Sequence, residues 1–463
     1  MQRPRRVLGD YYQLLLRHGL LAGQTPLRAD LGREVALVAC DSQKVVPGTL
    51  FLCKGAAFKG RYLSDALQKG AFAYVSERPY PEGDAAPCIQ VTDIRTAMGL
   101  MADLAYGHPS AALSITGITG TKGKTTTAYY LKSILDAWRE EEGKRPSAIL
   151  STIVTDDGLE RRPAKLTTPE PLDLQRHLFH AWSAGAEYVT MEVSSQALKY
   201  GRVIGVDLSC AVFLNIGEDH ISPVEHPDWA DYFASKLLIF RQARCACVNL
   251  DCDHAGEVLR AARSCPRVVT WSQRDPGADV YASQVRKEGE NLRFWVRTPR
   301  YEGELLLGMP GLFNIENALA AVAVAEVYGV PREAVARGLA RAAVPGRMEH
   351  YASADGQVSI LVDYAHNGMS LEALLRSARA EYPGRELTVV FGCTGGKGID
   401  RREGMGRAAG ALADRIILTE DDPGPEEVSA ICADIQRYLD PFGKRGEVIP
   451  NREEAEARAI LDC

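Results

Sequence analysis

The sequence predicts an α/β protein built from doubly wound units, and three observations lead to this fold class. A glycine-rich stretch, GITGTKGKTTT at 117–127, lies between an apolar strand-like run and a helical pattern. Several other apolar runs end in polar residues, which is typical of parallel strands whose carboxyl ends carry ligand sites. The 463-residue length suggests about three domains by the usual domain size.

We expect the three domains to span residues 1–105, 106–343 and 344–463. The first contains short strand-like runs, GTLFLC and AFAYVSE, with helical connections. The second opens close to the glycine-rich stretch and alternates strands with helices. The third follows a Pro/Gly hinge in VPGRMEHY and contains SILVDYAHN, LTVVFGCTGG and RIILTEDDPG, which predict three strands of a Rossmann-like doubly wound domain.

The glycine-rich stretch resembles a phosphate-binding P-loop with altered spacing. The usual pattern is G-x-x-x-x-G-K-[ST], but here Gly117 comes one position too early. Backbone N–H groups at a strand–loop–helix junction bind anions, Lys124 adds positive charge, and Thr125 offers a hydroxyl to a phosphate-bound Mg²⁺. A tight turn with a helix cap is the alternative. We expect a strand over 113–116, then a helix with a broad apolar face: Tyr129, Leu131, Ile134 and Leu135.

Other candidate site residues follow the predicted strands. Glu192 ends one run, and Asp219 and His220 end the next, so these side chains could hold Mg²⁺, although a solvated charge is the simpler reading of a lone glutamate. Lys236 lies beside the apolar side of a helical pattern, where a lysine is usually an ordinary amphipathic stem. Asn314 and Asn317 could bind an adenine edge, or Asn314 could be a helix N-cap.

Composition excludes several classes of protein. The chain is 46% hydrophobic and 25% charged with a formal charge of −6, which argues against a general nucleic-acid or membrane-surface binder. The N-terminus is no convincing signal peptide, and the longest apolar run is too short to span a bilayer. Eleven cysteines suit a reducing cytosol. A set of buried thiols or a zinc site is expected at Cys245, Cys247, Cys252 and His254.

Motifs in one order along nearly the whole chain resemble the Mur ligase family, in its MurE-type branch. These are DSQKVVPGTLFLCKG, GITGTKGKTTT, TTPEP, EVSSQAL, DH with YFASK, GLFNIENAL, PGRME, DYAHN and GCTGGKGIDRREGM. The family spaces its loop glycines as this chain does, which favours the P-loop reading. The resemblance implies a central P-loop ATPase domain and an ATP-dependent acid–amino-acid ligase.

The resemblance also implies residue roles. Catalysis would use Lys124, Glu192, His220 and Lys236, with Lys236 carbamoylated and acting as an acidic metal ligand. Magnesium would be held by Thr125, Glu192, His220 and the Lys236 carbamate. ATP would be bound by Gly120, Thr121, Lys122, Gly123, Lys124, Thr125, Thr126, Asn314, Asn317, Arg347, Asp363 and His366. The muramoyl nucleotide would contact Ser42, Thr167, Thr168, Ser194 and Arg202.

The reaction implied is addition of a third amino acid to UDP-MurNAc-L-Ala-D-Glu through an acyl phosphate, in peptidoglycan precursor biosynthesis and thus in cell-wall formation, shape and division. The implied cofactors are ATP and Mg²⁺, and the partners are the dipeptide nucleotide and a free amino acid. We expect a cytoplasmic monomer with no nucleic-acid partner and no membrane span.

Departures from the family pattern affect substrate choice. Lys122 replaces the usual Asn. The diaminopimelate-adding enzymes carry D-N-P-R, whereas this chain has Asp421, Asp422, Pro423 and Gly424. An acidic site without the arginine predicts an amino-acid substrate with a side-chain ammonium, such as L-lysine or L-ornithine. The usual G-K-G-H-E segment is not found. A folylpolyglutamate-synthase-like ligase and a nucleotide-binding pseudoenzyme remain alternatives.

Overall fold

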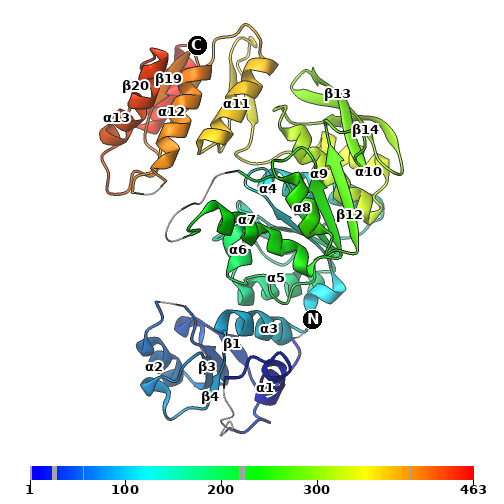
Figure 1. Ribbon diagram of the computed structural model, residues 1–463, viewed down its shortest axis with the longest axis vertical. Coiled ribbons are helices and arrows are strands. Elements are labelled where there is room, and N and C mark those ends of the chain that lie inside the picture. Colours follow the sequence, from blue (N-terminus) through cyan, green and yellow to red (C-terminus); the bar gives the residue numbers. More distant parts are fainter. Residues whose placement is uncertain (1–2, 23–28, 56, 218–220, 222–224, 397) are drawn as a thin grey trace. The chain divides into compact units, whose positions relative to one another are not determined.

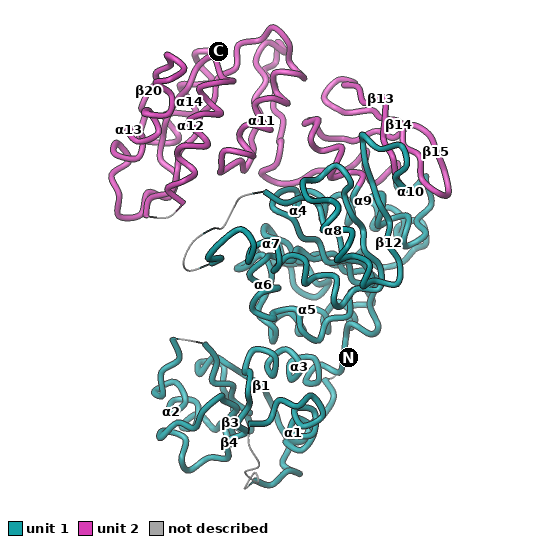
Figure 2. The backbone as a smooth tube through the Cα atoms, in the orientation of Figure 1, with its two compact units in different colours: residues 1–279, 320–335 teal, residues 280–319, 336–463 magenta. Residues whose placement is uncertain are grey.

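The computed structural model describes residues 3–22, 29–55, 57–217, 221, 225–396 and 398–463. The protein is a mixed α/β structure (Figure 1), which confirms the predicted fold class. It divides into two compact units: residues 1–279 with 320–335, and residues 280–319 with 336–463 (Figure 2). The three predicted domain bounds stay a prediction.

The N-terminal part of unit 1 is a parallel sheet in the order β1-β2-β3-β4. Its strands are buried by apolar side chains of the flanking helices, and all four residues of β2 are buried. The carboxyl ends of β1 and β2 therefore lie on the same edge. The elements are α1 (Leu8–Arg17), β1 (Leu37–Ala39), η1 (Ser42–Lys44), β2 (Thr49–Leu52), α2 (Gly60–Gln68), β3 (Ala71–Ser76), η2 (Pro81–Gly83), β4 (Cys88–Gln90), α3 (Ile94–Tyr106) and η3 (Pro109–Ala112).

The rest of unit 1 carries a larger sheet, with β5 at its centre between β9 and β10 and parallel to both. The strand order is β12-β11-β10-β5-β9-β6-β7-β8, and β7 and β8 are antiparallel. The elements are β5 (Ser114–Thr119), α4 (Lys124–Glu141), β6 (Ala148–Leu150), β7 (Val154–Asp156), β8 (Arg161–Pro163), α5 (Pro171–Ser183), β9 (Tyr188–Glu192), α6 (Ser195–Lys199), β10 (Cys210–Phe213), α7 (Trp229–Leu237), η4 (Leu238–Gln242), β11 (Cys245–Asn249), α8 (Ala255–Ala262) and β12 (Arg267–Ser272).

The glycine whose spacing looked anomalous belongs to the strand. Gly117 lies inside β5, and a Cβ there would come within 2.9 Å of the Leu208 side chain. It therefore allows close packing, while the loop itself starts at Gly120. Tyr130, which is fully buried, replaces Tyr129 on the apolar face predicted for α4, because it lies one helical turn before the buried Ile134.

Unit 2 begins with an antiparallel meander, β13 to β15, whose residues alternate between buried and partly exposed positions. The helix α9 starts in unit 2 and continues into unit 1. The elements are β13 (Val280–Glu288), β14 (Asn291–Arg297), β15 (Glu302–Leu307), α9 (Asn314–Tyr328), α10 (Arg332–Ala340), β16 (Glu349–Ala352), β17 (Ser359–Val362), α11 (Gly368–Glu381), β18 (Thr388–Phe391), α12 (Asp400–Leu412), β19 (Arg415–Leu418), α13 (Val428–Leu439), η5 (Asp440–Phe442), β20 (Glu447–Val448) and α14 (Arg452–Leu461).

The C-terminal sheet is parallel and doubly wound, in the order β18-β19-β20. Side chains of α11, α12 and α13 bury one face of β18 and β19, and α14 covers the other through Ala455 and Ala459. One expected strand lies elsewhere. SILV forms β17, but it pairs antiparallel with β16 in a separate two-stranded sheet, so only two of the three predicted runs join the doubly wound sheet.

Candidate active site

The glycine-rich loop connects β5 to α4 and has the backbone of an anion-binding turn. Gly120 and Gly123 have φ values of 153° and 84°, which side chains rarely adopt. A Cβ on Gly120 would also approach Leu214 Cβ to 2.9 Å. Because α4 starts at Lys124 with Gly123 as its N-cap residue, its first N–H groups are directed at the loop. Thr125 and Thr126 are buried in this first turn.

Asn215, which follows β10, holds the loop in place. Its Oδ1 accepts from Lys122 N–H at 2.9 Å, and its Nδ2 donates to Lys122 O at 3.2 Å. Thr121 completes the support, since its Oγ1 lies 3.1 Å from the Tyr232 hydroxyl and accepts from Gly217 N–H at 3.0 Å. Sequence reasoning missed Asn215 as a loop-positioning residue, although it lies at a predicted strand end.

Lys124 and Lys236 converge on one carbonyl. Lys124 Nζ donates to Gly120 O at 2.8 Å, and Lys236 Nζ donates to the same oxygen at 2.9 Å. Lys236 is 2% exposed, with its Nζ 4.6 Å from the ring centroid of Tyr232. The sequence pattern around Lys236 predicted an ordinary amphipathic lysine at the surface. That prediction is wrong, because this lysine points into the protein beside the loop.

Glu192 ends β9 next to β5, paired in register with Ile118, and is 1% exposed. The Glu192 carboxylate is therefore not the solvated surface charge that was the simpler reading of the sequence. Both of its oxygens are held by one residue: Thr152 N–H donates to Oε1 at 2.7 Å, and Thr152 Oγ1 donates to Oε2 at 3.1 Å. Thr152 follows β6 and was not singled out from the sequence. A buried carboxylate beside a phosphate-type loop is a donor that suits Mg²⁺.

The predicted muramoyl-dipeptide residues of the central sheet lie around the same strand end. Thr168 Oγ1 donates to Glu192 O at 3.0 Å and accepts from Ser194 N–H at 3.0 Å. Thr167 Oγ1 lies 3.2 Å from Thr152 Oγ1, and Arg202 Nη1 is 3.4 Å from Thr168 O. Ser42 is the first residue of η1, which follows β1 of the N-terminal sheet, and its side chain is largely buried.

The remaining predicted ATP-binding residues lie in unit 2, in two groups. In the first group, Asn314 Nδ2 donates to Pro310 O at 2.7 Å, and Asn317 Nδ2 donates to Asn314 Oδ1 at 3.1 Å. Asn314 is the first residue of α9 and not its N-cap residue.

The second group surrounds Tyr364. Arg347 Cζ lies 4.2 Å from the Tyr364 ring centroid, and His366 Nδ1 is 2.9 Å from Tyr364 O. Burial raises the pKa of the Asp363 carboxyl, opposed by the Arg347 charge and by hydrogen bonds from Met348 and Ala365 N–H.

The acidic motif after β19 has a distinctive backbone. Asp422 and Gly424 both have positive φ, 48° and 56°. Neither aspartate caps the next helix, because α13 is preceded by Glu427 as its N-cap residue. Asp421 Oδ1 lies 3.9 Å from Arg452 Nη2.

Arg402, which lies in the GIDRREGM segment, could bind a distal carboxylate in place of the missing arginine, but it is already paired. Its guanidinium contacts Glu426 at 2.9 Å and Asp434 at 3.2 Å, and its side chain is 6% exposed. The predicted Asp219 and His220 fall outside the described residues.

The zinc alternative for Cys245, Cys247, Cys252 and His254 is wrong for the described parts of the chain, because these four residues do not gather there, whereas the alternative of buried thiols is confirmed for Cys245 and Cys247. Cys245 and Cys247 instead lie near Cys210 on the neighbouring strand, all three buried, with 3.3 Å between the Cys210 and Cys247 sulfurs. The cysteines are free thiols.

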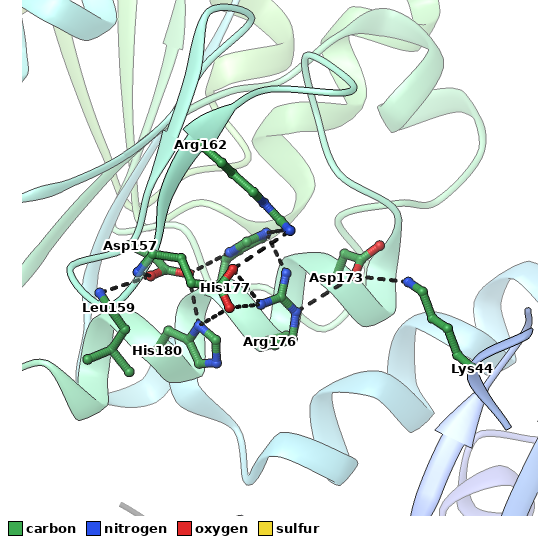
Figure 3. A network of polar contacts seen from close by, with 9 residues as sticks. Lys44, Asp157, Leu159, Arg162, Asp173, Arg176, His177 and His180 are labelled. Carbon is green, nitrogen blue, oxygen red and sulfur yellow. Dashed lines mark hydrogen bonds and ion pairs between the residues drawn. The ribbon is translucent and has the colours of Figure 1, made fainter. Parts of the chain in front are cut away.

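A second cluster of metal-ligand types joins the β7–β8 turn to α5 (Figure 3), but its hydrogen bonds do not suit a cation. Asp157 Oδ2 lies 2.6 Å from His177 Nδ1 and 3.0 Å from His180 Nδ1. Guanidinium groups of Arg162 and Arg176 approach His177 Nε2 to 3.0 and 3.1 Å. His177 Nε2 must therefore accept, with its proton on Nδ1 and directed at Asp157. Coordination through Nδ1 would place an Nε2–H against two other donors.

Residues 118–325 match the Mur ligase middle domain, and residues 346–463 match the Mur ligase glutamate ligase domain. The chain is 41% identical over 414 residues to the UDP-N-acetylmuramoyl-L-alanyl-D-glutamate–L-lysine ligase of Enterococcus faecalis, covering 88% of this chain and 80% of that protein. The chain belongs to the Mur ligase family. The enzyme of the same name from Streptococcus pneumoniae is 37% identical over 427 residues, covering 91% of this Mur ligase and 84% of the relative.

A solved structure of a UDP-N-acetylmuramoyl-L-alanyl-D-glutamate–2,6-diaminopimelate ligase is also similar to this Mur ligase. Its TM-score is 0.70 at 26% identity, covering 98% of this chain and 90% of the other. Among the helices of the described residues, none is both long and apolar enough to cross a bilayer. Membership of this family makes the protein an ATP-dependent ligase that forms a C–N bond.

Proposed function

We propose that this Mur ligase adds L-lysine to UDP-MurNAc-L-Ala-D-Glu, using ATP and Mg²⁺, in the cytoplasm and as a monomer. The observation that carries the proposal is the convergence, within unit 1, of a phosphate-type loop, the buried Glu192, the buried Lys236 and the Thr167–Thr168 segment. The relatives named above, which carry L-lysine in their names, support the choice of amino acid.

The residues fit the chemistry of acyl activation. A glutamyl carboxylate oxygen attacks the γ-phosphorus of ATP, the bond from that phosphorus to the β–γ bridging oxygen breaks, and ADP leaves. Lys124 and the loop N–H groups stabilise the transferred phosphoryl group. The amine then attacks the acyl phosphate, loses a proton, and phosphate leaves as the amide forms. Mg²⁺ held at Glu192 would offset negative charge on the phosphoryl oxygens.

Carbamoylation of Lys236 is part of the proposal. Two ammonium groups share Gly120 O, and that of Lys236 is buried. Like charges so placed repel each other. A carbamate replaces one positive charge by a negative one, so it would pair with Lys124 and supply an acidic oxygen ligand for the metal.

Selection of L-lysine is assigned to the acidic motif, where Asp421 and Asp422 would meet the side-chain ammonium. Asparagine substitutions of the two aspartates test this assignment better than an arginine at position 424. Gly424 has a φ of 56°, so an arginine introduced there would carry backbone strain in addition to its charge. Substitution of the aspartates by asparagine leaves the backbone less perturbed, because asparagine tolerates positive φ.

The mechanism is tested with UDP-MurNAc-dipeptide labelled with ¹⁸O in its glutamyl carboxylates. An acyl phosphate transfers one labelled oxygen to inorganic phosphate, and ADP release requires both the nucleotide and L-lysine. A folylpolyglutamate-synthase-like activity would instead show ADP release with a folate and glutamate. A pseudoenzyme would bind both nucleotides without turnover. Unlabelled phosphate from an active enzyme would contradict the mechanism.

A further inference from the structure

Three charged residues from distant parts of unit 1 meet beside the predicted dipeptide-binding segment. Lys54 follows β2 at the carboxyl edge of the N-terminal sheet, and Glu170 follows the Thr167–Thr168 pair. Lys54 Nζ donates to Glu170 Oε2, and Arg202 Nε lies 2.9 Å from Glu170 Oε1. We call these three residues the Glu170 triad.

The Glu170 triad contains one carboxylate for two cations, so it carries a net charge of +1. Its side chains are 23%, 28% and 16% exposed for Lys54, Glu170 and Arg202. In the part of the chain that the structure describes, neither cation has a second acidic partner within 4 Å. A partly desolvated excess positive charge favours binding of an anionic oxygen group, either a carboxylate or a phosphate.

The Glu170 triad is connected by hydrogen bonds to the carboxyl end of β9, where Glu192 lies. Arg202 Nη1 approaches Thr168 O at 3.4 Å, and Thr168 Oγ1 is bonded to the main chain of Glu192 and Ser194. Glu170 therefore fixes the direction of Arg202 relative to Glu192. It also brings a lysine of the N-terminal sheet to the same place.

A neighbouring ion pair offers a natural comparison. Lys44 and Asp173 join the same two regions, the N-terminal sheet and the start of α5, at 3.7 Å (Figure 3). Their side chains are 61% and 43% exposed, so this pair is well solvated and contributes little.

We propose that Lys54 is a substrate-binding residue for an anionic group of the muramoyl-peptide nucleotide, and that Glu170 is a positioning residue that orients Lys54 and Arg202 for it. The inference rests on the proposed function. Neither residue was singled out from the sequence.

The test is calorimetric binding of UDP-MurNAc-L-Ala-D-Glu and of UDP-N-acetylglucosamine, which has the diphosphate but no carboxylate. Lys54→Met is expected to weaken binding of the dipeptide nucleotide by about tenfold, whereas Lys44→Met changes it by less than about twofold. A loss confined to the dipeptide nucleotide assigns Lys54 to a carboxylate, and a loss shared by both ligands assigns it to the diphosphate. Wild-type affinity in Lys54→Met would overturn the role of Lys54.

Glu170→Gln separates positioning from simple electrostatics. The substitution raises the net charge of the triad, so pure electrostatics predicts tighter anion binding. Positioning predicts weaker binding and a higher KM for the dipeptide nucleotide, with the KM for ATP unchanged. Tighter binding would overturn the positioning role.

Further controls separate a loss of the Lys54 cation from misfolding of the variant and from failure of the proposed function. Lys54→Arg retains the cation and is expected to bind like wild type. Lys54→Gln replaces Lys54→Met if that variant does not fold: a tenfold loss supports the cation role, and wild-type affinity overturns it. Wild-type protein that neither binds the dipeptide nucleotide nor forms a tripeptide would refute the proposed function, not the triad alone.

Discussion

Replacing Thr152 by valine isolates one of the two contacts that hold the Glu192 carboxylate. The hydroxyl donates to Glu192 Oε2 at 3.1 Å, while the backbone N–H, which valine keeps, donates to Oε1 at 2.7 Å. A hydrogen bond to a charged group contributes about 1.5–3 kcal/mol, and because Thr152 is exposed we expect the lower part of that range. A loss of about 1.4 kcal/mol in the transition state lowers kcat about tenfold.

The assay is steady-state amide formation at saturating ATP and amino acid, with Mg²⁺ varied. We expect Thr152→Val to lower kcat and to raise the Mg²⁺ concentration needed for half-maximal rate, with little change in Tm. Thr152→Ser keeps the hydroxyl and should behave like wild type. Wild-type kcat and Mg²⁺ dependence in Thr152→Val would refute the claim that Thr152 orients a metal-binding Glu192.

Lys124→Ala is expected to raise the barrier by about 3–4 kcal/mol; near-wild-type kcat at saturating ATP would exclude its phosphoryl role. Lys236→Ala should be nearly inactive and partly rescued by short-chain carboxylic acids, and ¹³C-bicarbonate NMR of wild type should show a carbamate; an ordinary ammonium in active enzyme would contradict this. Asp422→Asn should lower kcat/KM for L-lysine about tenfold, and unchanged selectivity would remove that residue from the amino-acid pocket. Asp157→Asn should destabilise the protein near neutral pH and much less at acid pH, as measured by urea unfolding.

The sign of the Asp157 prediction follows from its pKa. Burial alone would raise it, but hydrogen bonds from His177 and from Glu160 and Leu159 N–H outweigh this and lower the pKa from 3.8 to about 2. A depressed carboxyl pKa contributes stability above the unfolded value, and this is lost as pH falls from about 4 towards 2. The shift corresponds to at most about 2.4 kcal/mol. An equal loss in Asp157→Asn at all pH values would contradict this linkage.

Local patterns were sufficient for much of the fold and site. The apolar run before the loop and the helix after it placed Lys124 and Thr125, because strand–loop–helix signals are local. The Lys236 environment was not predictable in this way, since its burial depends on packing against a loop 116 residues away in sequence. Thr152 and Glu170 were missed for the same reason.

The pairing of strands within the sheets also could not be predicted from the sequence of each strand alone. The SILV run reads like β18 and β19, yet it pairs with β16, because the choice of neighbour is decided by tertiary contacts that a strand's own residues do not record.

The most direct test of the central claim is the mass of the nucleotide product formed by wild-type protein with ATP, Mg²⁺, UDP-MurNAc-L-Ala-D-Glu and an equimolar mixture of L-lysine, L-ornithine and meso-diaminopimelate. We predict a product heavier than the dipeptide nucleotide by one lysyl residue, formed with one ADP per product. A predominant diaminopimelate product would contradict the lysine assignment, and the absence of any tripeptide product from folded, ATP-binding protein would contradict the proposed ligase activity itself.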